Sequence, residues 1–534
     1  MKKITVFLAM VIVFAMIIGC SATDDAWKSN TGTINLDSMS VTGDGISIDG
    51  NTVKITSGGD FTVSGTLANG MIYVNADSKV KLRLSGCSIT NSSGPAIYFD
   101  NVEEGLITIT ENTENFIADG STYTDEEANA ALFSNDDLEI KGSGTLTVTA
   151  NYKHGIASDD DLLIENGNIV INSYEHGIKV NNTLHITGGN ISVKTETGKG
   201  LKAEQELVID DGQIVIDSFD EGIESKGTLV INGGNIDITS GEDGINTGSS
   251  DTATSEAETA TEQGAEPQMP ENMTPPQMPE GGENGEMPQP PMEDGRGMGD
   301  RGGMAPNGEA PEGEMPENMT PPQMPQGNAN GEMPQNAMGR GMGRIDEETA
   351  KAHSITINGG YIYIKAEGDG IDSNGNLTVN GGTVIIDGPT SSGNGSLDSE
   401  GTMSITGGTV LTVSNGGMMQ LPRSDDGQSI LNINLTEKQA AGTEISIKDA
   451  DGNELIKYTS VKEFRSIVLS HKDITTDNEY TVYINGEQNT TVTAGANSFG
   501  GMGGMRGGRP GGSENRNHQV QSTDGGINVK VGNQ

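Results

Sequence analysis

Acidic side chains recur at a fixed spacing in the later part of the chain and could together bind a divalent cation. A glycine followed by isoleucine or leucine repeats along the sequence, and in the later repeats the residues flanking this pair are acids or an amide. If the repeats stack, like charges one repeat apart repel by about 1 to 3 kcal/mol per pair, which favours a counter-ion. Oxygen atoms from several repeats are the ligands that Ca²⁺ takes. We therefore predict a Ca²⁺ site, with a solvated acidic face as the alternative. The candidate ligands are Glu221, Glu224, Asp243, Asn246, Asp369, Asp372 and Asp398.

The same two positions in earlier repeats carry lysine or histidine, which could add catalysis. A lysine removed from water can act as a general base, and beside Ca²⁺ it could abstract the proton α to a uronate carboxylate. Lys179 and Lys202 are the candidates for such a polysaccharide lyase. We prefer the alternative that these lysines neutralise the neighbouring acids. His154 and His176 could bind a transition metal, but two ligands without a third are weak evidence.

A repeat of about 22 residues positions these side chains. The glycines of the Gly-Ile or Gly-Leu pairs are Gly155, Gly177, Gly200, Gly222 and Gly244, at intervals of 22, 23, 22 and 22 residues. Between them, polar and apolar residues alternate over short stretches, which predicts strands of about three to five residues. Because such strands cannot bury an apolar face alone, we expect them to coil around one interior. The predicted fold is all-β, a right-handed parallel β-helix with about 22 residues per coil. A β-sandwich would not repeat glycine pairs at a constant spacing.

Composition divides the rest of the chain. From Asp251 to Arg344 there is no Leu, Ile, Val, Phe, Tyr or Trp, so this stretch cannot bury enough apolar surface to fold. Its many methionines could capture a soft metal, but we prefer a low-complexity spacer. After Leu421, ordinary alternating strands with Asp-Gly and Asn-Gly turns predict a small β cap on the open end of the solenoid. The predicted segments are a signal peptide (1–20), an N-terminal linker or cap (21–45), the first part of the β-helix (46–247), a disordered insertion (248–353), the second part of the β-helix (354–414), the β cap (415–494) and a disordered Gly-rich tail (495–534).

The N-terminal residues predict export and lipidation. Lys2 and Lys3 precede an apolar run that is typical of a secretory signal and shorter than the roughly 20 residues of a membrane span. The run ends in a sequence that resembles a bacterial lipobox, so we expect cleavage before Cys20 and acylation of this residue. An ordinary signal peptide is the alternative. The protein would then be exported and lipid-anchored at the cell membrane or cell surface. With 76 acidic and 31 basic residues and a net charge of -45, nucleic acid is excluded as a partner.

An ordered series of motifs in the first half of the chain resembles a known family. The series comprises Gly65-Thr66-Leu67, Val80-Lys81-Leu82, Ala96-Ile97-Tyr98, Thr113-Glu114-Asn115, Ala130 to Leu138, Gly142 to Val148 and His154-Gly155-Ile156. It is similar to the carbohydrate-binding β-helix proteins of clostridia and their relatives, over roughly residues 33 to 250 and 354 to 490. The resemblance implies a parallel β-helix with bound calcium, similar in shape to family 9 pectate lyases. It also implies secreted or surface-held proteins that bind polygalacturonate and cellulose without established catalysis. The chain departs from the pattern at Ser158-Asp159-Asp160-Asp161, where a lysine is usual, and in its Met-rich insertion.

These observations predict a surface-anchored protein that binds an acidic polysaccharide such as polygalacturonate through Ca²⁺ and without catalysis, with cellulose as a further candidate ligand. A chain of charge -45 needs a cation to hold an anionic polymer. A calcium-dependent pectate lyase is one alternative, and a structural adhesin or stalk is another. The expected partners are an extracellular polysaccharide and, through the lipid anchor, the membrane.

Overall fold

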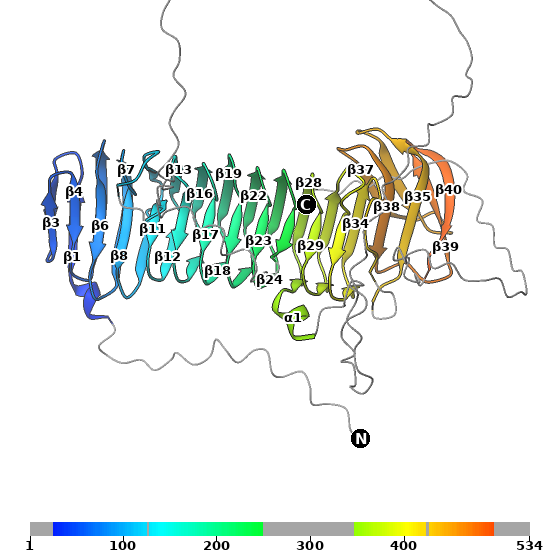
Figure 1. Ribbon diagram of the computed structural model, residues 1–534, viewed down its shortest axis with the longest axis horizontal. Coiled ribbons are helices and arrows are strands. Elements are labelled where there is room, and N and C mark those ends of the chain that lie inside the picture. Colours follow the sequence, from blue (N-terminus) through cyan, green and yellow to red (C-terminus); the bar gives the residue numbers. More distant parts are fainter. Residues whose placement is uncertain (1–24, 125–127, 249–346, 423–426, 496–534) are drawn as a thin grey trace, which may run out of the picture. The chain divides into compact units, whose positions relative to one another are not determined.

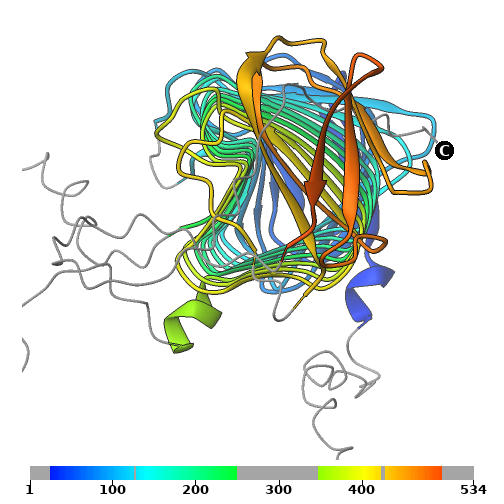
Figure 2. The same ribbon diagram turned by 90° about the vertical axis from the view of Figure 1, so that its right-hand side faces the viewer.

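The protein folds into a parallel β-helix closed by a β cap, as the sequence predicts. The structure is a computed structural model that describes residues 25–124, 128–248, 347–422 and 427–495. Short strands stack coil upon coil, and a view along the solenoid shows successive coils superimposed (Figures 1 and 2). Among the described residues, no helix is long and apolar enough to cross a membrane.

One wall of the solenoid is a twelve-stranded sheet that carries most of the predicted site. Its strands pair in parallel except for β3 and β4, which form an antiparallel hairpin. In ladder order the strands are β3 (Ile46–Asp49), β4 (Thr52–Ile55), β6 (Met71–Asn75), β8 (Ile97–Asn101), β11 (Ala130–Ser134), β14 (His154–Ser158), β17 (Ile178–Val180), β20 (Leu201–Ala203), β23 (Ile223–Ser225), β26 (Ile245–Thr247), β29 (Ile371–Ser373) and β32 (Leu397–Ser399).

The other walls form two parallel ladders that share the long bent strands β5 (Gly59–Leu67) and β7 (Val80–Thr90). The first ladder continues through β9 (Gly105–Ile109), β12 (Leu138–Gly142), β15 (Leu162–Ile164), β18 (Thr183–Ile186), β21 (Glu206–Ile209), β24 (Thr228–Ile231), β27 (Ile355–Ile357), β30 (Leu377–Val379) and β33 (Met403–Ile405). The second continues through β10 (Glu114–Ala118), β13 (Thr145–Ala150), β16 (Asn168–Ser173), β19 (Asn190–Thr195), β22 (Gln213–Ser218), β25 (Asn235–Ser240), β28 (Tyr361–Ala366) and β31 (Thr383–Asp387) to β34 (Thr409–Ser414). Strand β1 (Thr31–Asn35) pairs with the first half of β5 and so begins the first ladder.

Aliphatic side chains from all three walls fill one interior. In a single coil, Ile178, Leu184 and Ile191 are each at most 1% exposed, while the residues that alternate with them face outward. Successive coils repeat this arrangement, so the apolar side chains form continuous stacks along the solenoid. This burial provides the main driving force for folding.

The recurring glycines have two separate structural causes. A Cβ at Gly177 would clash with Val193 inside the solenoid and would lie 2.6 Å from the carbonyl oxygen of Gly200 in the next coil. Glycine is therefore required before the Ile or Leu in this coil, and a similarly close contact is found at Gly155, Gly200, Gly222, Gly244 and Gly370. Gly189 has a φ of 101°, in the left-handed region that glycine adopts at no steric cost, and the equivalent glycine recurs at the same corner of other coils.

Two segment boundaries differ from the prediction. Strand β1 pairs in parallel with β5, so the solenoid ladder begins inside the segment assigned to a linker or cap, because Ile34 already fills the interior. A short 3-10 helix, η1 (Ala26–Ser29), precedes it, and β2 (Ser40–Thr42) pairs antiparallel with β1. At the other boundary, α1 (Glu347–Ala352) occupies part of the segment predicted to be disordered. The Glu347–Lys351 ion pair, 2.6 Å long, spans one turn of this helix and supports it. Residues 249–346, the signal peptide and nearly all of the Gly-rich tail lie outside the described residues.

The C-terminal cap covers the last coil. Strand β38 (Phe464–His471) pairs antiparallel with β34 and with β35 (Ile430–Gln439), so the cap continues the second ladder. A four-stranded antiparallel sheet packs with it, and its strands in ladder order are β37 (Glu454–Thr459), β36 (Glu444–Lys448), β39 (Glu479–Ile484) and β40 (Glu487–Thr493). The buried Asp387 carboxylate joins the two parts, because it accepts hydrogen bonds from Tyr458, from Tyr363 at 2.9 Å and from Ser460 at 2.8 Å.

Candidate functional site

Outward-facing residues at the middle of the twelve-stranded sheet form one continuous column. Strand pairing places each member directly beside the next, so the alignment inferred from the 22-residue period is correct from Lys179 to Asp398. The character of the column changes along the solenoid from aromatic to basic to acidic. Its members are Lys54, Tyr73, Tyr98, Phe133, Ala157, Lys179, Lys202, Glu224, Asn246, Asp372 and Asp398.

A second column lies in the turns that enter this sheet, just before each recurring glycine. Backbone hydrogen bonds from each glycine N–H to the carbonyl of the next coil hold it in register. Its members are His154, His176, Lys199, Glu221, Asp243 and Asp369, and Gly395 takes the next position.

Histidine and aspartate perform the same task in this second column. The Nδ1 atom of His176 accepts the backbone N–H of Lys199 at 3.0 Å, and Oδ1 of Asp243 accepts that of Asp369 at 2.6 Å. Oδ1 of Asp369 in turn accepts the N–H of Gly395 at 2.6 Å. Each of these aspartates therefore uses one oxygen to bind the next coil and keeps the other oxygen for a further ligand.

Three of the predicted ligands gather at one point. Asp369, Asp372 and Asp398 each offer a carboxylate oxygen, and these oxygens all lie within 4.8 Å of one another. All three side chains are half-buried. Asp398 also accepts the N–H of Ser399 at 2.9 Å and a hydrogen bond from the Gln420 amide. Three converging carboxylates with spare lone pairs form an anionic centre that a hard cation would neutralise.

The electrostatics of this centre show how strongly it needs a counter-charge. Burial, followed by repulsion from Asp243 and then Asp398, raises the pKa of Asp372 to about 7. Burial likewise raises the pKa of Asp243 to about 7 and raises the pKa values of Asp369 and Asp398 above the ordinary range. The ionised centre is therefore costly when no positive charge is bound.

Asn246 supplies a further candidate oxygen ligand, on an independent observation. Its Oδ1 atom is buried and has no hydrogen-bond partner within the described part of the chain. Strand pairing places Asn246 directly beside Asp372, one coil upstream. A buried carbonyl oxygen without a donor is unfavourable by about 1 to 3 kcal/mol. Three carboxylates and one amide oxygen match the hard oxygen ligands of Ca²⁺, so the residues present fit the predicted metal.

Glu221 and Glu224 do not join this centre in the structure. Both carboxylates contact the Lys199 ammonium, and the Lys199 Nζ to Glu221 Oε2 distance is 2.6 Å. Burial opposes the charge on Lys199, but Glu224 and Glu221 more than offset this effect and raise its pKa. A lysine from the upstream coil thus neutralises the first two acids of the series. This agrees with the interpretation that the lysines neutralise neighbouring acids and do not act as catalytic bases. The candidate metal centre is Asp369, Asp372 and Asp398 with Asn246, and Asp243 borders it.

The two candidate general bases lie far from this centre. Lys202 is three coils upstream of Asp372 in the same column, a separation of about 14 Å at the usual strand spacing. Its ammonium lies 3.1 Å from Glu204, which holds it as a hydrogen-bond donor. Lys179 is one coil further away. A lyase that combined either lysine with the candidate metal centre could not place both at one sugar residue.

The two histidines form a stacked pair rather than an open ligand set. Their rings are parallel to within 3° at a centroid distance of 4.9 Å, and Glu175 lies near enough to complete a group of three. However, the Nδ1 atoms of His154 and His176 both accept backbone N–H groups, which places the ring protons on Nε2. Burial, and then the nearby Lys202, lowers the pKa of His176 to about 3, so the ring is neutral at pH 7. This arrangement favours a structural pair over a transition-metal site.

The aromatic start of the column is covered. Tyr98 and Phe133 are buried against one another and form a small apolar cluster with Ala128 and Ala157. Tyr73 donates a 2.6 Å hydrogen bond to Asp100 and packs against the same cluster. Tyr98 and Phe133 thus stabilise the upstream coils and present little surface to a ligand, and Tyr73 is half-buried.

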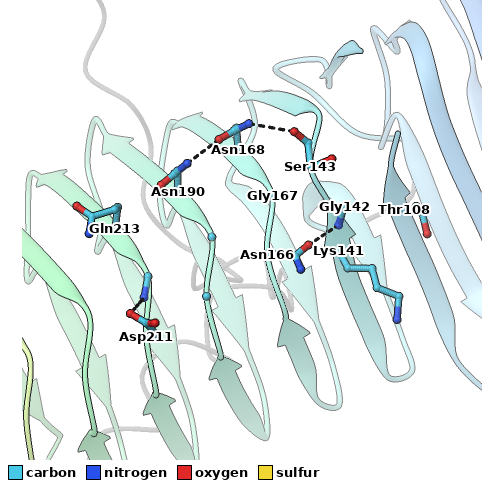
Figure 3. Close-up of a pocket in the computed structure, with 13 residues that line it drawn as sticks. Thr108, Lys141, Gly142, Ser143, Asn166, Gly167, Asn168, Asn190, Asp211 and Gln213 are labelled. Carbon is cyan, nitrogen blue, oxygen red and sulfur yellow. Dashed lines mark hydrogen bonds between the residues drawn. The ribbon is translucent and has the colours of Figure 1, made fainter. Parts of the chain in front are cut away.

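A groove of about 890 Å³ runs across the corner between the two ladders, where glycines such as Gly167 and Gly189 recur (Figure 3). Amide side chains line it, and they hydrogen-bond to one another from coil to coil. Asn190 donates to Asn168 at 2.7 Å, and Asn168 donates to the Ser143 carbonyl at 3.3 Å. Because the amides largely satisfy each other, this groove is better explained as a structural ladder than as the principal binding site.

Comparisons with known proteins relate the chain to one family. A family model described as "Carbohydrate-binding domain-containing protein" matches residues 49–206, 197–262 and 328–453, which together make up more than half of the chain. A protein of that same description from Acetivibrio thermocellus is 37% identical over 137 residues, covering 24% of this chain and 48% of the relative. The chain thus spans about half the length of that relative. A solved structure, that of the polysaccharide lyase-like protein from C. thermocellum in a gadolinium derivative, shares 32% sequence identity and covers 40% of this chain and 92% of its own, with a TM-score of 0.38. The chain belongs to the family of carbohydrate-binding domain-containing proteins.

Proposed function

We propose that the protein binds an acidic polysaccharide, such as polygalacturonate, through Ca²⁺ held by Asp369, Asp372 and Asp398, and that it does so without catalysis. The observation that carries the proposal is the convergence of these three carboxylates within 4.8 Å of one another. Asp372 and Asp398 lie on the outer face of the twelve-stranded sheet, and Asp369 lies in the turn that enters it. Membership of a carbohydrate-binding family supports a polysaccharide as the ligand. The proposal also includes anchoring at the cell surface through an acylated Cys20, which lies outside the described residues.

The residues of the centre divide into ligands and supports. Asp372 and Asp398 are neighbours in the central column and offer carboxylate oxygens from adjacent coils. Asp369 offers the oxygen that is left after its bond to Gly395, and Asn246 offers its buried Oδ1. When bound, Ca²⁺ supplies positive charge and free coordination positions that a uronate carboxylate can fill. A cation is required because the net charge of -45 would otherwise repel an anionic polymer.

Catalysis is not favoured by the site. The candidate bases Lys179 and Lys202 lie at least three coils from Asp372. We therefore expect no unsaturated uronate products when the protein is incubated with polygalacturonate and calcium, as followed by ultraviolet absorbance.

Calorimetric titration with an oligogalacturonate tests the proposal. The wild-type protein should bind in calcium and lose binding in EDTA. Asp398→Asn should reduce binding in calcium by at least about tenfold, because one ligand charge is removed. Asp44→Asn is the matched control, since Asp44 is an exposed carboxylate near the opposite end of the solenoid. Equal binding in calcium and EDTA, or equal loss in both variants, would contradict the proposed bridge.

A further inference from the structure

Two aromatic side chains are exposed at equivalent places in the turns that lead into the twelve-stranded sheet. Phe219 is 64% exposed and Tyr174 is 47% exposed, although the aromatic rings of the central column are mostly covered. Phe219 follows β22 and Tyr174 follows β16. A single exposed apolar residue needs no explanation, but aromatic rings repeated at one position of a solenoid mark a candidate binding surface.

The strand register fixes the spacing of these rings. Ser173 pairs with Thr195, and Lys194 pairs with Asp217, so the next positions align in three successive coils. These positions are Tyr174, Glu196 and Phe219, which we call the turn row. The two aromatic residues are two coils apart, about 9.6 Å at the usual strand spacing. The exposed carboxylate of Glu196 lies between them.

Local contacts hold the backbone of the turn row in place. The Thr197 hydroxyl donates a 2.6 Å hydrogen bond to the Tyr174 carbonyl, and the Phe219 N–H donates to the Thr195 hydroxyl at 3.1 Å. In the following coil the equivalent residue is Gly241, whose backbone packs directly against the Phe219 carbonyl. The row is therefore preorganised, and no side chain at position 241 covers Phe219 from the downstream side.

We propose that the turn row is a second carbohydrate subsite, which binds an extended β-1,4-linked glycan along the solenoid axis without calcium. Aromatic rings bind the apolar C–H faces of pyranose sugars, and a carboxylate accepts hydrogen bonds from their hydroxyl groups. In an extended β-1,4-linked chain the same face recurs once per disaccharide, over nearly the distance that separates Tyr174 from Phe219. Such a chain presents one sugar face to each ring and the intervening hydroxyl groups to Glu196.

The turn row is separate from the candidate calcium centre. Phe219 lies two residues before Glu221, whose carboxylate is paired with Lys199, and two coils upstream of Asp369. Removing calcium therefore leaves the turn row intact. This difference allows the second subsite to be tested independently of the calcium bridge.

Titration of the full chain with a β-1,4-linked glucose hexamer in EDTA tests the second subsite. We expect the wild type to bind, Tyr174→Ala and Phe219→Ala each to weaken binding by about five- to tenfold, and the double variant to show no binding. Because both side chains are exposed, thermal unfolding of the variants should match that of the wild type. Val461→Ala is the matched control, since Val461 is 51% exposed but lies in the cap.

Two further measurements distinguish this proposal from the calcium bridge and from non-specific carbohydrate binding. Asp372→Asn should keep binding to the glucose hexamer while it loses calcium-dependent uronate binding. An α-1,4-linked glucose hexamer, which curls, should bind clearly less than the β-linked one. The proposal is overturned if the wild type does not bind the β-linked hexamer in EDTA, if both aromatic variants bind like the wild type, if Val461→Ala weakens binding equally, or if the two hexamers bind alike.

Discussion

Asp372→Asn should raise the free energy of unfolding in the absence of calcium and reduce the stabilisation that calcium provides. In the absence of a cation, Asp372 lies beside Asp369 and Asp398. Burial, followed by repulsion from Asp243 and then from Asp398 and Asp369, raises its pKa to about 7. The unfolded chain has a carboxyl of ordinary pKa, 3.8. Between these two values the folded state binds more protons than the unfolded state, so the free energy of unfolding falls as the pH rises.

The size of the effect follows from the shift. A displacement from 3.8 to about 7 corresponds to an upper bound of about 4 kcal/mol at 1.36 kcal/mol per unit. Because Asp372 is only half-buried, solvent screening reduces this, and we expect Asp372→Asn to raise the free energy of unfolding by about 1 to 2 kcal/mol at pH 8 in EDTA. At pH 4 the wild-type carboxyl is already protonated in the folded state, so the variant should differ little from the wild type.

Urea unfolding at pH 8 and pH 4, with EDTA or with calcium, measures both effects. Calcium should stabilise the wild type at pH 8, because ligand binding to the folded state alone raises its stability. The same addition should stabilise the variant much less. The reasoning is refuted if the variant is less stable than the wild type at pH 8 in EDTA, or if calcium stabilises the two proteins equally. Asp44→Asn, with its exposed carboxylate, serves as the control that should change neither value.

Three other predictions follow from the same structure. Lys199→Met leaves the half-buried Glu221 and the buried Glu224 carboxylates without their partner and should lower the free energy of unfolding at pH 7 by about 3 kcal/mol. An unchanged urea midpoint would show that this ion pair contributes little. Deleting the insertion and joining residue 248 to residue 347 should leave both the free energy of unfolding and uronate binding unchanged, because Asn246 and Asp372, on either side of the insertion, pair directly in one sheet. Loss of glycan binding would instead support an adhesive insertion. Cys20→Ser should abolish incorporation of labelled fatty acid and release the protein from the membrane fraction, while continued labelling would contradict lipidation at this residue.

The periodicity of the sequence was sufficient to predict the fold and the alignment of the columns. Glycine recurs because a Cβ at Gly177 would enter the space of Val193, and this steric limit marks the coils from Gly155 to Gly370 in the sequence. Once the coils are in register, residues at the same offset from the glycine must be neighbours. That is why Lys202, Glu224, Asn246 and Asp372 could be placed in one column before any coordinates were known.

The grouping of the acids within the columns could not be predicted in the same way. It depends on how far a side chain reaches and on what it meets. Lys199 extends to the next coil and forms ion pairs with Glu221 and Glu224, so these two acids do not belong to the candidate metal centre. Alignment of the repeats alone does not reveal these ion pairs. The unpartnered Oδ1 of Asn246 is likewise visible only when every nearby donor is placed.

The turn row was missed for a related reason. The sequence has few aromatic residues, and the alternation pattern does not show which of them are covered. Tyr98 is buried in an apolar cluster, whereas Phe219 is exposed, and glycine occupies the equivalent position of the next coil. An inspection of the residues three places before each recurring glycine would have found Tyr174 and Phe219.

Anomalous diffraction from a crystal grown with calcium and a short oligogalacturonate tests the central claim most directly. We predict one anomalous peak about 2.3 to 2.6 Å from oxygen atoms of Asp369, Asp372 and Asp398, with a uronate carboxylate on its open side. A peak elsewhere, or a ligand bound with no metal between it and these three carboxylates, would contradict the proposed calcium bridge.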